Sequence, residues 1–258
     1  MKIQTEKISF SYPENDSEVI SDISLTIDGR GATAIVGKNG SGKTTLLKLL
    51  AGILEPDQGE MYFEGNKKLI GFSPENPKDG FFKDKVLEEI EFYPKNLGKD
   101  YQERAKSAMR KMSIRDLKDR SPYTLSIGEM KKVSLASILS GEPDTICLDE
   151  PIRSLHRQSE REIGRILENL KKNTAIIFST HNTDFAYEYA DRVIVMKDGE
   201  ILEKGKPKSV LSNKEICRKA GLKIPALIEL SEKRDIEPPE SFDEAINIFF
   251  RGIENEEE

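Results

Sequence analysis

The feature that most constrains this chain is a glycine-rich stretch that joins a strand-like segment to a helix-like one. Residues 32–36 form a short apolar run, and residues 46–50 carry leucines at helical spacing. Glycine allows backbone conformations that a Cβ atom forbids, so successive N–H groups of such a loop can surround a phosphate at a helix N-terminus. The spacing is that of a P-loop, in which Lys43 reaches the β- and γ-phosphates and the Thr44 hydroxyl binds magnesium. The sequence therefore predicts a nucleoside triphosphate site at Gly37, Asn39, Gly40, Ser41, Gly42, Lys43, Thr44 and Thr45.

Composition narrows the classes of protein to which this chain can belong. Its 258 residues suffice for one large or two modest domains, each with a core. No stretch approaches the roughly 20 apolar residues of a membrane span, and no signal peptide precedes Met1, so the chain is expected in the cytosol unless a partner holds it at a membrane. The net charge of -6 argues against nonspecific nucleic-acid binding, which relies on clustered Lys and Arg. Cys147 and Cys217 lack metal-ligand spacing and are expected to be reduced structural thiols.

The segments on either side of the P-loop include several predicted strands. Residues 3–10 and 23–27 alternate apolar and polar side chains, the pattern of half-buried antiparallel strands, and are expected to flank the nucleotide. Residues 60–63 and 68–72 also read as strands. Tyr12 could pack on the core or stack on adenine, and the P-loop downstream favours adenine stacking.

A helical insertion is expected at about residues 74–140. Helical patterns at 85–92 and 101–112 are separated by residues 94–98, which begin with proline and end with glycine. A third helix is expected to start near Ser126.

Two carboxylates follow a buried, strand-like run at residues 144–148. Asp149 is placed to hold magnesium opposite the P-loop, and Glu150 is placed to orient and polarise the attacking water. His181 follows a predicted strand at 174–179. A lone histidine is usually structural, but ligands bind at the carboxyl edge of parallel sheets, so we predict that His181 senses the γ-phosphate.

The remaining segments complete an alternating α/β pattern. Helices are expected at 157–171 and 183–190, with strands at 174–179 and 192–196, which implies a parallel sheet with helices on its faces. Residues 197–200 contain the Asp-Gly signal of a hairpin turn.

Beyond residue 205 the pattern changes to short helices, expected around residues 207–220, 225–233 and 241–251. No function is assigned to the acidic residues 254–258. The last helix has one apolar face that something must cover, made of Phe242, Ala245, Ile246, Phe249 and Phe250.

In combination, these motifs resemble the ATP-binding subunits of ABC transporters, and the resemblance covers about residues 1–205. It implies that the P-loop is the Walker A motif, that residues 145–150 are Walker B, that His181 is the switch histidine and that Tyr12 stacks on adenine. The family signature, LSGGQ, falls at residues 125–129. Two such ATPases pair head to tail, so each ATP lies between the Walker motifs of one subunit and the signature of the other. The signature residues offered to a partner site are Ser126, Ile127, Gly128 and Glu129.

The resemblance implies an α/β P-loop NTPase domain with a parallel-sheet core, an antiparallel β subdomain and a helical insertion. A small helical C-terminal extension, residues 206–258, is then expected to help dimerisation. Residues 72–77 and 86–98 look like the ATPases of energy-coupling factor importers, which include cobalt and nickel importers, and in which this segment contacts the membrane subunit. The expected protein is an ATPase that uses ATP and Mg²⁺ at the cytoplasmic face of the membrane to energise import of a vitamin or transition metal ion. Its partners would be a second ATPase, an integral membrane coupling subunit and a substrate-capture subunit.

Three residues depart from the family pattern. Glu75 stands where the family usually has Gln, and the resemblance adds it to the metal ligands Thr44 and Asp149; Ile127 replaces a second Gly, and His156 replaces Asp. A β-branched side chain at Ile127 should obstruct close approach to a partner's phosphate, or the φ angle that glycine provides. We hypothesise that the chain lends a weakened signature to its partner while its own Walker residues stay intact, which predicts a heterodimer with unequal sites. The alternative is neutral drift in a working homodimer.

Two other functions compete with this expectation. A soluble ABC ATPase of DNA repair or translation would act on nucleic acid. However, repair types carry a long coiled-coil insertion and translation types carry two nucleotide domains, and neither feature is visible here. A nucleotide-binding regulatory subunit with little catalysis is harder to exclude because of the three altered residues. Substitution of Glu150 by Gln separates a catalytic subunit from a regulatory one. If the site of this chain is not catalytic, the substitution should leave transport unaffected.

Overall fold

The computed structural model describes residues 2–13, 17–64, 70–98 and 100–250, with the backbone alone for residues 249 and 250. Among these residues, none of the helices combines the length and the apolar content needed to cross a membrane.

An antiparallel sheet begins the fold. Its strands are β1 (Lys2–Phe10), β2 (Ile20–Asp28) and β4 (Gln58–Glu64), in the order β2-β1-β4. From Ile23 to Ile27, buried and exposed side chains alternate along β2, as expected for a sheet with one covered face. The strands predicted at 3–10, 23–27 and 60–63 are therefore confirmed, each somewhat longer than the pattern indicated.

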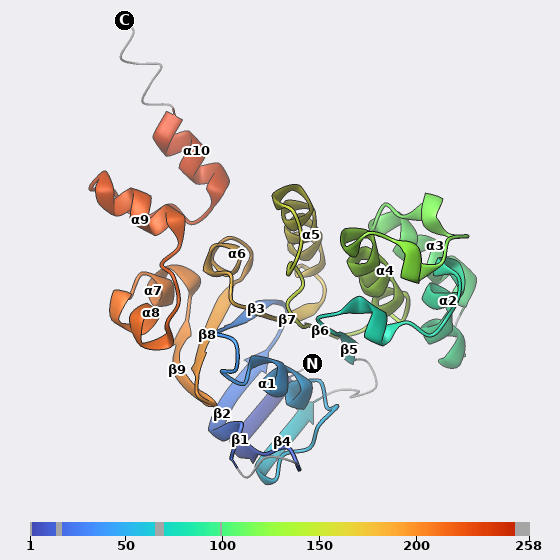
Figure 1. The fold of residues 1–258 in the computed structure, drawn as a ribbon, viewed down its shortest axis with the longest axis horizontal. Helices are drawn as coiled ribbons and strands as arrows, with labels where there is room; N and C mark the ends of the chain where they lie inside the picture. The colour runs from blue at the N-terminus through green and yellow to red at the C-terminus, as the bar shows by residue number, and fades with distance from the viewer. Residues whose placement is uncertain (1, 14–16, 65–69, 99, 251–258) are drawn as a thin grey trace, which may run out of the picture.

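The helix after the P-loop, α1 (Lys43–Leu50), lies between this sheet and a second, larger one (Figure 1). Its leucines share one hydrophobic core with Ile8 and Ile20 of the antiparallel sheet and with Ile177 and Ile194 of the larger sheet. Burial on both sides explains why this helix is so rich in leucine, and it holds the P-loop against two sheets at once.

The larger sheet has the order β5-β6-β7-β3-β8-β9. The first five strands in this order, β5, β6, β7, β3 and β8, run parallel. Strand β9 pairs antiparallel with β8 through a hairpin. Asp198 and Gly199 in this hairpin have φ angles of +48° and +85°, so the predicted turn is confirmed. Residues 68 and 69 of the strand predicted at 68–72 lie outside the described residues. The strands are β3 (Gly31–Val36), β5 (Ile70–Ser73), β6 (Thr145–Leu148), β7 (Ala175–Thr180), β8 (Arg192–Lys197) and β9 (Glu200–Gly205).

The helical insertion stands at one side of this sheet (Figure 1). The predicted break at residues 94–98 is wrong in part, because α2 continues through Pro94 to Asn96. Pro94 lies in the last turn, where its missing N–H removes a single helical hydrogen bond, and its side chain is buried. Packing therefore outweighs the local preference of proline. The helix ends shortly before Gly98, whose φ angle is +65°. The insertion comprises the short 3-10 segments Pro77–Gly80, Arg115–Leu117 and Pro122–Thr124 and the helices α2 (Val86–Asn96), α3 (Tyr101–Lys111) and α4 (Ile127–Ser140).

Two further helices, α5 (Arg157–Leu170) and α6 (Thr183–Tyr189), connect the strands of the larger sheet as predicted. Cys147 in β6 and Cys217 near the C-terminus are both buried and free. Burial raises the pKa of the Cys147 thiol to about 12, which agrees with a structural rather than a reactive role.

The C-terminal segment forms α7 (Pro207–Leu211), α8 (Lys214–Ala220), α9 (Ala226–Lys233) and α10 (Phe242–Phe250) on the side opposite the insertion (Figure 1). The single helix predicted around 207–220 is two helices, because the Asn213 side chain accepts hydrogen bonds from the N–H groups of Glu215 and Ile216 and starts a new one.

Helix α6 fastens this segment to the rest of the molecule. The Asp184 carboxylate accepts a hydrogen bond from the Ala226 N–H at 2.6 Å, and the Tyr187 hydroxyl donates to the carbonyl oxygen of Pro239 at 2.6 Å. On α10, Ala245 is buried while Phe242 and Ile246 are exposed. The side chains of the predicted apolar residues Phe249 and Phe250 lie outside the described residues, as do residues 254–258.

Candidate active site

The P-loop leaves the first turn of α1 open. Gly40 and Gly42 have φ angles of +83° and +93°, in the left-handed region that favours glycine. A Cβ atom on Gly42 would lie 2.8 Å from the carbonyl oxygen of Val19. No side chain caps the N-terminus of α1, and its first turn contains no acidic residue. The N–H groups of this turn are therefore available to an anion.

The Lys43 ammonium folds back against the loop. It donates hydrogen bonds to the carbonyl oxygens of Gly37 at 2.9 Å and Lys38 at 3.0 Å, and it lies 3.9 Å from a carboxylate oxygen of Glu150. Burial lowers the pKa of Lys43, while the negative charges of Glu150 and Asp149 oppose this shift. The predicted phosphate-binding lysine thus points into the loop that it would serve.

Asp149 follows β6 with its carboxylate facing the P-loop. The Thr44 hydroxyl lies 3.0 Å from both oxygens of this carboxylate and donates to it, and the Ser179 hydroxyl donates to Oδ1. The Asp149 side chain is buried. The structure therefore brings together Thr44 and Asp149, the two residues predicted to bind magnesium from their motifs.

Glu150 combines an unusual backbone with a buried carboxylate. Its φ angle is +43°, a conformation that typically costs a non-glycine residue about 1–3 kcal/mol. Its N–H donates to Ser179 Oγ at 2.9 Å, and its carboxylate oxygens lie 3.0 and 3.1 Å from Nδ1 of His181. The His181 side chain is about half exposed, at 51%. The predicted catalytic carboxylate and the predicted phosphate sensor are thus in direct contact.

Three residues that the sequence did not single out complete the site. The buried Lys131 ammonium donates to the carbonyl oxygens of Glu150 at 2.7 Å and Glu75 at 3.2 Å. Arg153 forms an ion pair with the Glu75 carboxylate, and Ser179 contacts both acidic residues at the end of β6. All three act through partners distant in the sequence. In the sequence alone, the only indication of their roles was that they lie near motif residues.

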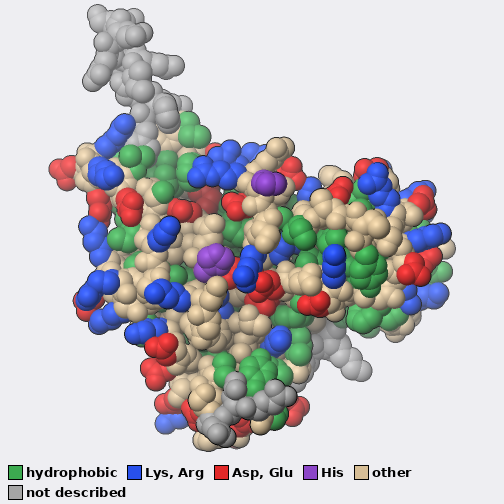
Figure 2. All heavy atoms as spheres, viewed as in Figure 1, with side chains coloured by type: hydrophobic (Ala, Val, Ile, Leu, Met, Phe, Trp, Pro, Cys, Tyr) green, Lys and Arg blue, Asp and Glu red, His purple; other side chains and the backbone are tan. Residues whose placement is uncertain are grey.

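A pocket of about 320 Å³ lies over the P-loop, lined by residues 39, 40 and 42–45 together with Val19, Glu75, Glu150 and Arg153. Glu75, which the resemblance adds as a metal ligand, borders this pocket but is paired with Arg153. Figure 2 shows one of the two histidines near the centre of this face, with acidic and basic side chains beside it.

Tyr12 lies just after β1, beside the P-loop helix. Its hydroxyl is 3.2 Å from Thr45 Oγ1, and its ring meets the edge of Phe10 with 5.0 Å between ring centroids. The side chain is half-buried against the core in this position. Its stacking on adenine stays a prediction.

The signature segment forms the N-terminus of α4 (Ile127–Ser140) and is closed by its own side chains. The Ser126 hydroxyl donates to the Glu129 carboxylate at 2.7 Å, and the same carboxylate accepts the Ser126 N–H at 2.8 Å. This capping box lowers the pKa of Glu129 through the hydrogen bonds from the Ser126 side chain and backbone. The N-terminus of α4 therefore already holds a carboxylate.

Ile127 is the first residue of α4 and is 40% exposed. Its φ angle is negative, as in any helix, so the predicted conflict with a glycine-specific φ is wrong. Obstruction of a partner's phosphate by the side chain stays a prediction. His156 is exposed at the N-cap of α5 and makes no side-chain capping bond.

The donor set fits a triphosphate with a divalent cation. The Ser41 hydroxyl is buried and has no hydrogen-bond partner among the described residues. Within the same residues, no group of three or more His, Cys, Asp or Glu side chains could hold a metal alone. Mg²⁺ is usually held by one or two carboxylates together with substrate phosphates and water, and Thr44 with Asp149 forms such a partial site.

Comparison with known proteins places this site in a family. The sequence model of the ABC transporter family matches residues 20–153. The chain is 35% identical over 257 residues to the energy-coupling factor transporter ATP-binding protein EcfA of Methanocaldococcus jannaschii, with 92% of each protein covered. It is 33% identical over 246 residues to EcfA of Carboxydothermus hydrogenoformans, with 90% of each covered.

A solved structure agrees with this assignment. The structure of cbiO1 from Clostridium perfringens, described as part of the ABC transporter complex cbiONQ, aligns with a TM-score of 0.75 and 30% sequence identity. The alignment covers 89% of this chain and 98% of that one. The P-loop ABC ATPase fold expected from the sequence is thereby confirmed. The chain belongs to the ABC transporter family and, within it, to the ATP-hydrolysing subunits of energy-coupling factor transporters.

Proposed function

We propose that Glu150 orients and polarises the water that attacks ATP, and that this hydrolysis drives import of a small micronutrient, a vitamin or a transition metal ion. The position of the Glu150 carboxylate carries the proposal. It is buried at the edge of the P-loop pocket, 3.9 Å from the Lys43 ammonium and in contact with His181. A carboxylate in that position can accept a proton from water as the new bond to phosphorus forms.

The other groups of the chain would bind and orient the nucleotide. The open first turn of α1 and the Lys43 ammonium would hold the phosphates and stabilise the charge that develops on them. Because Nδ1 of His181 faces Glu150, its Nε2 is left to contact the γ-phosphate. Mg²⁺, held by Thr44 and Asp149, would polarise the phosphate oxygens as a Lewis acid.

Replacement of Glu150 by Gln tests this role. The amide keeps the shape and the hydrogen-bonding capacity of the side chain but accepts no proton, so hydrolysis should fall roughly 100- to 10,000-fold while ATP affinity changes little. Phosphate release and binding of a fluorescent ATP analogue measure the two quantities. Glu168→Gln, on the exposed face of α5, is the matched control. Unchanged hydrolysis in Glu150→Gln would instead favour the regulatory, weakly catalytic subunit.

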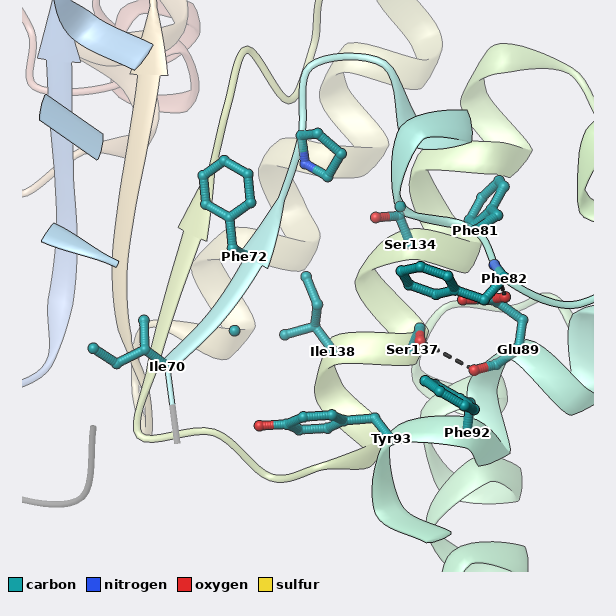
Figure 3. A pocket seen from close by; sticks show the side chains of 13 residues that line it. Ile70, Phe72, Phe81, Phe82, Glu89, Phe92, Tyr93, Ser134, Ser137 and Ile138 are labelled. Atoms are coloured by element: carbon teal, nitrogen blue, oxygen red, sulfur yellow. Dashed lines mark hydrogen bonds between the residues drawn. The ribbon is translucent and has the colours of Figure 1, made fainter. Parts of the chain in front are cut away.

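Docking on an integral membrane coupling subunit is the second part of the proposal. A cavity of about 200 Å³ lies between β5 and the helices α2 and α4, and Figure 3 shows its aromatic lining. Phe82 borders it with 69% of its surface exposed. The buried Glu89 carboxylate accepts hydrogen bonds from the N–H groups of Phe82 at 2.8 Å and Lys83 at 2.9 Å, which holds this loop in place. An exposed aromatic side chain on a fixed loop is typical of an interface anchor.

Docking there would keep the chain at the cytoplasmic face of the membrane without a span of its own. Phe82→Ala should then reduce retention of the chain on membranes that contain the coupling subunit, while ATP binding stays unchanged. Tyr62→Ala, which removes another exposed aromatic ring from β4, is the control. Equal retention of both variants would contradict this docking surface.

An unequal pair of ATPases is the third part. The Glu129 carboxylate accepts hydrogen bonds from both the N–H and the hydroxyl of Ser126, the N-cap residue of α4, and adds a negative charge where a partner's phosphate would approach. The exposed Ile127 adds bulk at the same end. We therefore expect this signature to bind ATP weakly, and a second ATPase with an intact signature to complete this chain's own site. A separate substrate-capture subunit would select the cargo.

The C-terminal extension is proposed to contribute to that pairing. Helix α10 exposes Phe242, Ile246 and Ile248, with exposed fractions of 46%, 52% and 44%. Exposed apolar side chains gathered on a short helix are typical of a contact surface. The DNA-repair and translation alternatives have no structural feature in their favour among the described residues.

A further inference from the structure

Lys131 is a buried charged residue in the active site that the proposed mechanism does not use. It lies in the second turn of α4, and only 7% of its surface is exposed. Burial lowers the pKa of Lys131 to about 8, and the negative charges of Glu75 and Glu150 oppose this shift. A cation in such a place destabilises a protein unless its donors are satisfied, so its hydrogen bonds indicate what it is for.

Both hydrogen bonds of Lys131 go to backbone atoms. Its Nζ donates to the carbonyl oxygen of Glu150 at 2.7 Å and to that of Glu75 at 3.2 Å. One ammonium thus joins three segments that are distant in the sequence: the helix that begins with the signature, the residue that follows Asp149, and the loop that opens the helical insertion.

Glu150 is the residue that needs such a restraint. Its left-handed φ of +43° is unfavourable for a side chain with a Cβ atom, so surrounding contacts must maintain it. Its N–H is fixed by Ser179 Oγ at 2.9 Å, and its carbonyl oxygen accepts from Lys131 Nζ and from the Arg153 N–H at 3.1 Å. These contacts determine the direction in which the Glu150 side chain leaves the backbone, toward His181 and the P-loop pocket.

The second bond extends the restraint to Glu75. Lys131 holds the Glu75 carbonyl oxygen, while the Glu75 carboxylate pairs with Arg153 three residues beyond Glu150. The loop at Glu75 and the turn at Glu150 are therefore tied together twice. A displacement of the insertion or of the signature helix would be transmitted to the carboxylate that faces the attacking water.

We propose that Lys131 is a positioning residue for ATP hydrolysis, which holds the backbone of Glu150 in the left-handed conformation that aims its carboxylate at the attacking water. It acts through Glu150 and does not touch the substrate. The inference rests on the proposed role of Glu150.

Three variants of the full-length chain test the inference. Lys131→Met keeps the length of the side chain but removes the donors, Lys131→Arg keeps a donor, and Lys132→Met makes the same change at the neighbouring lysine, which pairs instead with Glu162 on α5 at 2.6 Å. Lys131→Met should reduce the single-turnover rate of hydrolysis about 10- to 100-fold with ATP affinity changed less than about threefold. Lys131→Arg should recover much of the rate, and Lys132→Met should behave like the unmodified chain.

Hydrogen exchange supplies a readout that does not depend on the rate of hydrolysis. The Arg153 N–H is bonded to the carbonyl oxygen that Lys131 holds, so residues 150–153 should exchange faster in Lys131→Met and not in Lys132→Met. Unchanged exchange together with an unchanged rate would overturn the inference. So would a parallel loss of ATP affinity and hydrolysis, since that result indicates a general structural role.

The Glu150→Gln variant separates this inference from the function on which it rests. If Glu150→Gln abolishes hydrolysis and Lys131→Met leaves it intact, only the role of Lys131 fails. If Glu150→Gln hydrolyses ATP normally, the proposed role of Glu150 fails first, and the exchange experiment still decides whether Lys131 restrains that turn. In a double variant, Lys131→Met should add little to the defect of Glu150→Gln, because both changes act on the same group.

Discussion

Two helix N-termini in this molecule, those of α1 and α4, carry glycine-containing motifs and are built in opposite ways. The N-terminus of α1 is preceded by Gly42 at φ +93°, has no side-chain cap and has no acid in its first turn. The N-terminus of α4 is capped by Ser126 and by the Glu129 carboxylate. The first keeps its N–H groups for an external anion, while at the second the N–H and hydroxyl of the N-cap serine donate to a carboxylate of the same helix. The uncapped end of α1 is therefore the one that this chain leaves free for a phosphate.

The glycines at these two helix ends, Gly42 and Gly128, also differ in whether the chain itself requires them. Gly42 is required by its backbone angle and by the Val19 carbonyl oxygen, which lies 2.8 Å from the place that a Cβ atom would take. A Cβ atom on Gly128, by contrast, would meet nothing closer than 3.5 Å. Within this chain the signature therefore needs no glycine. Any requirement for one at that end of α4 must come from outside the chain.

The largest expected effect comes from matched glycine-to-alanine changes at the two helix ends. Gly42→Ala should lower the free energy of unfolding by about 2 kcal/mol or more and abolish nucleotide binding, because alanine is strained at positive φ. Gly128→Ala should raise the free energy of unfolding by about 0.4–1 kcal/mol, because it removes freedom from the unfolded chain without strain. Urea denaturation and binding of a fluorescent ATP analogue measure both. Similar losses in the two variants would contradict the comparison.

A slightly smaller loss of stability is expected from Ser179→Ala, which alters the site that the uncapped N-terminus of α1 belongs to. Ser179 is fully buried and accepts the Glu150 N–H, so its loss leaves a buried donor unpaired and should cost about 1–3 kcal/mol. Hydrolysis should fall as well, since the same hydroxyl also donates to Asp149. Ser137→Ala is the control, because that hydroxyl donates to the Glu89 carbonyl oxygen in the insertion, at 3.2 Å. An equal loss of hydrolysis in the two variants would count against the specific role of Ser179.

Removal of the Ile127 side chain from the capped N-terminus of α4 should have a moderate effect on stability and a qualitative one on association. Ile127→Gly places glycine in the first turn of a helix and should lower the free energy of unfolding by about 0.5–1 kcal/mol. Combined with Glu150→Gln to block hydrolysis, it should promote ATP-dependent association of two copies. Sedimentation velocity with and without Mg-ATP measures this, and no gain in association would mean that Ile127 is not the obstacle.

The smallest effect concerns the charge of Glu129. Its pKa is lowered in the folded chain, so its ionised form adds stability above the unfolded pKa, near 4.5, and that stability is lost as the pH falls through the folded pKa. Glutamine can still complete the capping box, so Glu129→Gln should lose only a few tenths of a kcal/mol at neutral pH. The difference should vanish in acid. Thermal denaturation across pH checks it, and a difference that grows as the pH falls would contradict the assigned sign.

Much of this fold follows from local pattern. The P-loop spacing, the two acids after β6 and the alternation of strands and helices each depend on residues adjacent in the sequence, and the structure contains these elements. Pro94 marks the limit of this approach, because its burial within the insertion outweighs its local tendency to end a helix. The expected φ conflict at Ile127 failed for a related reason, since the position becomes the first residue of a capped helix.

The residues that complete the site could not be predicted from spacing. Lys131 reaches Glu75 and Glu150 across 56 and 19 positions of the sequence, and Ser179 reaches Glu150 across 29. Their roles depend on which strands and helices become neighbours in three dimensions. The P-loop residues, by contrast, are fixed by a loop and a helix that follow each other directly.

The difference between the uncapped N-terminus of α1 and the capped N-terminus of α4 is tested most directly by light scattering of the Glu150→Gln chain with and without Mg-ATP. Blocked hydrolysis should trap any closed pair that two copies can form. We predict no ATP-dependent increase in mass for this chain alone, and an increase when a second ATPase subunit with an intact signature is added. An ATP-dependent homodimer of this chain alone would show that its signature serves a partner's ATP, and would contradict the unequal pair.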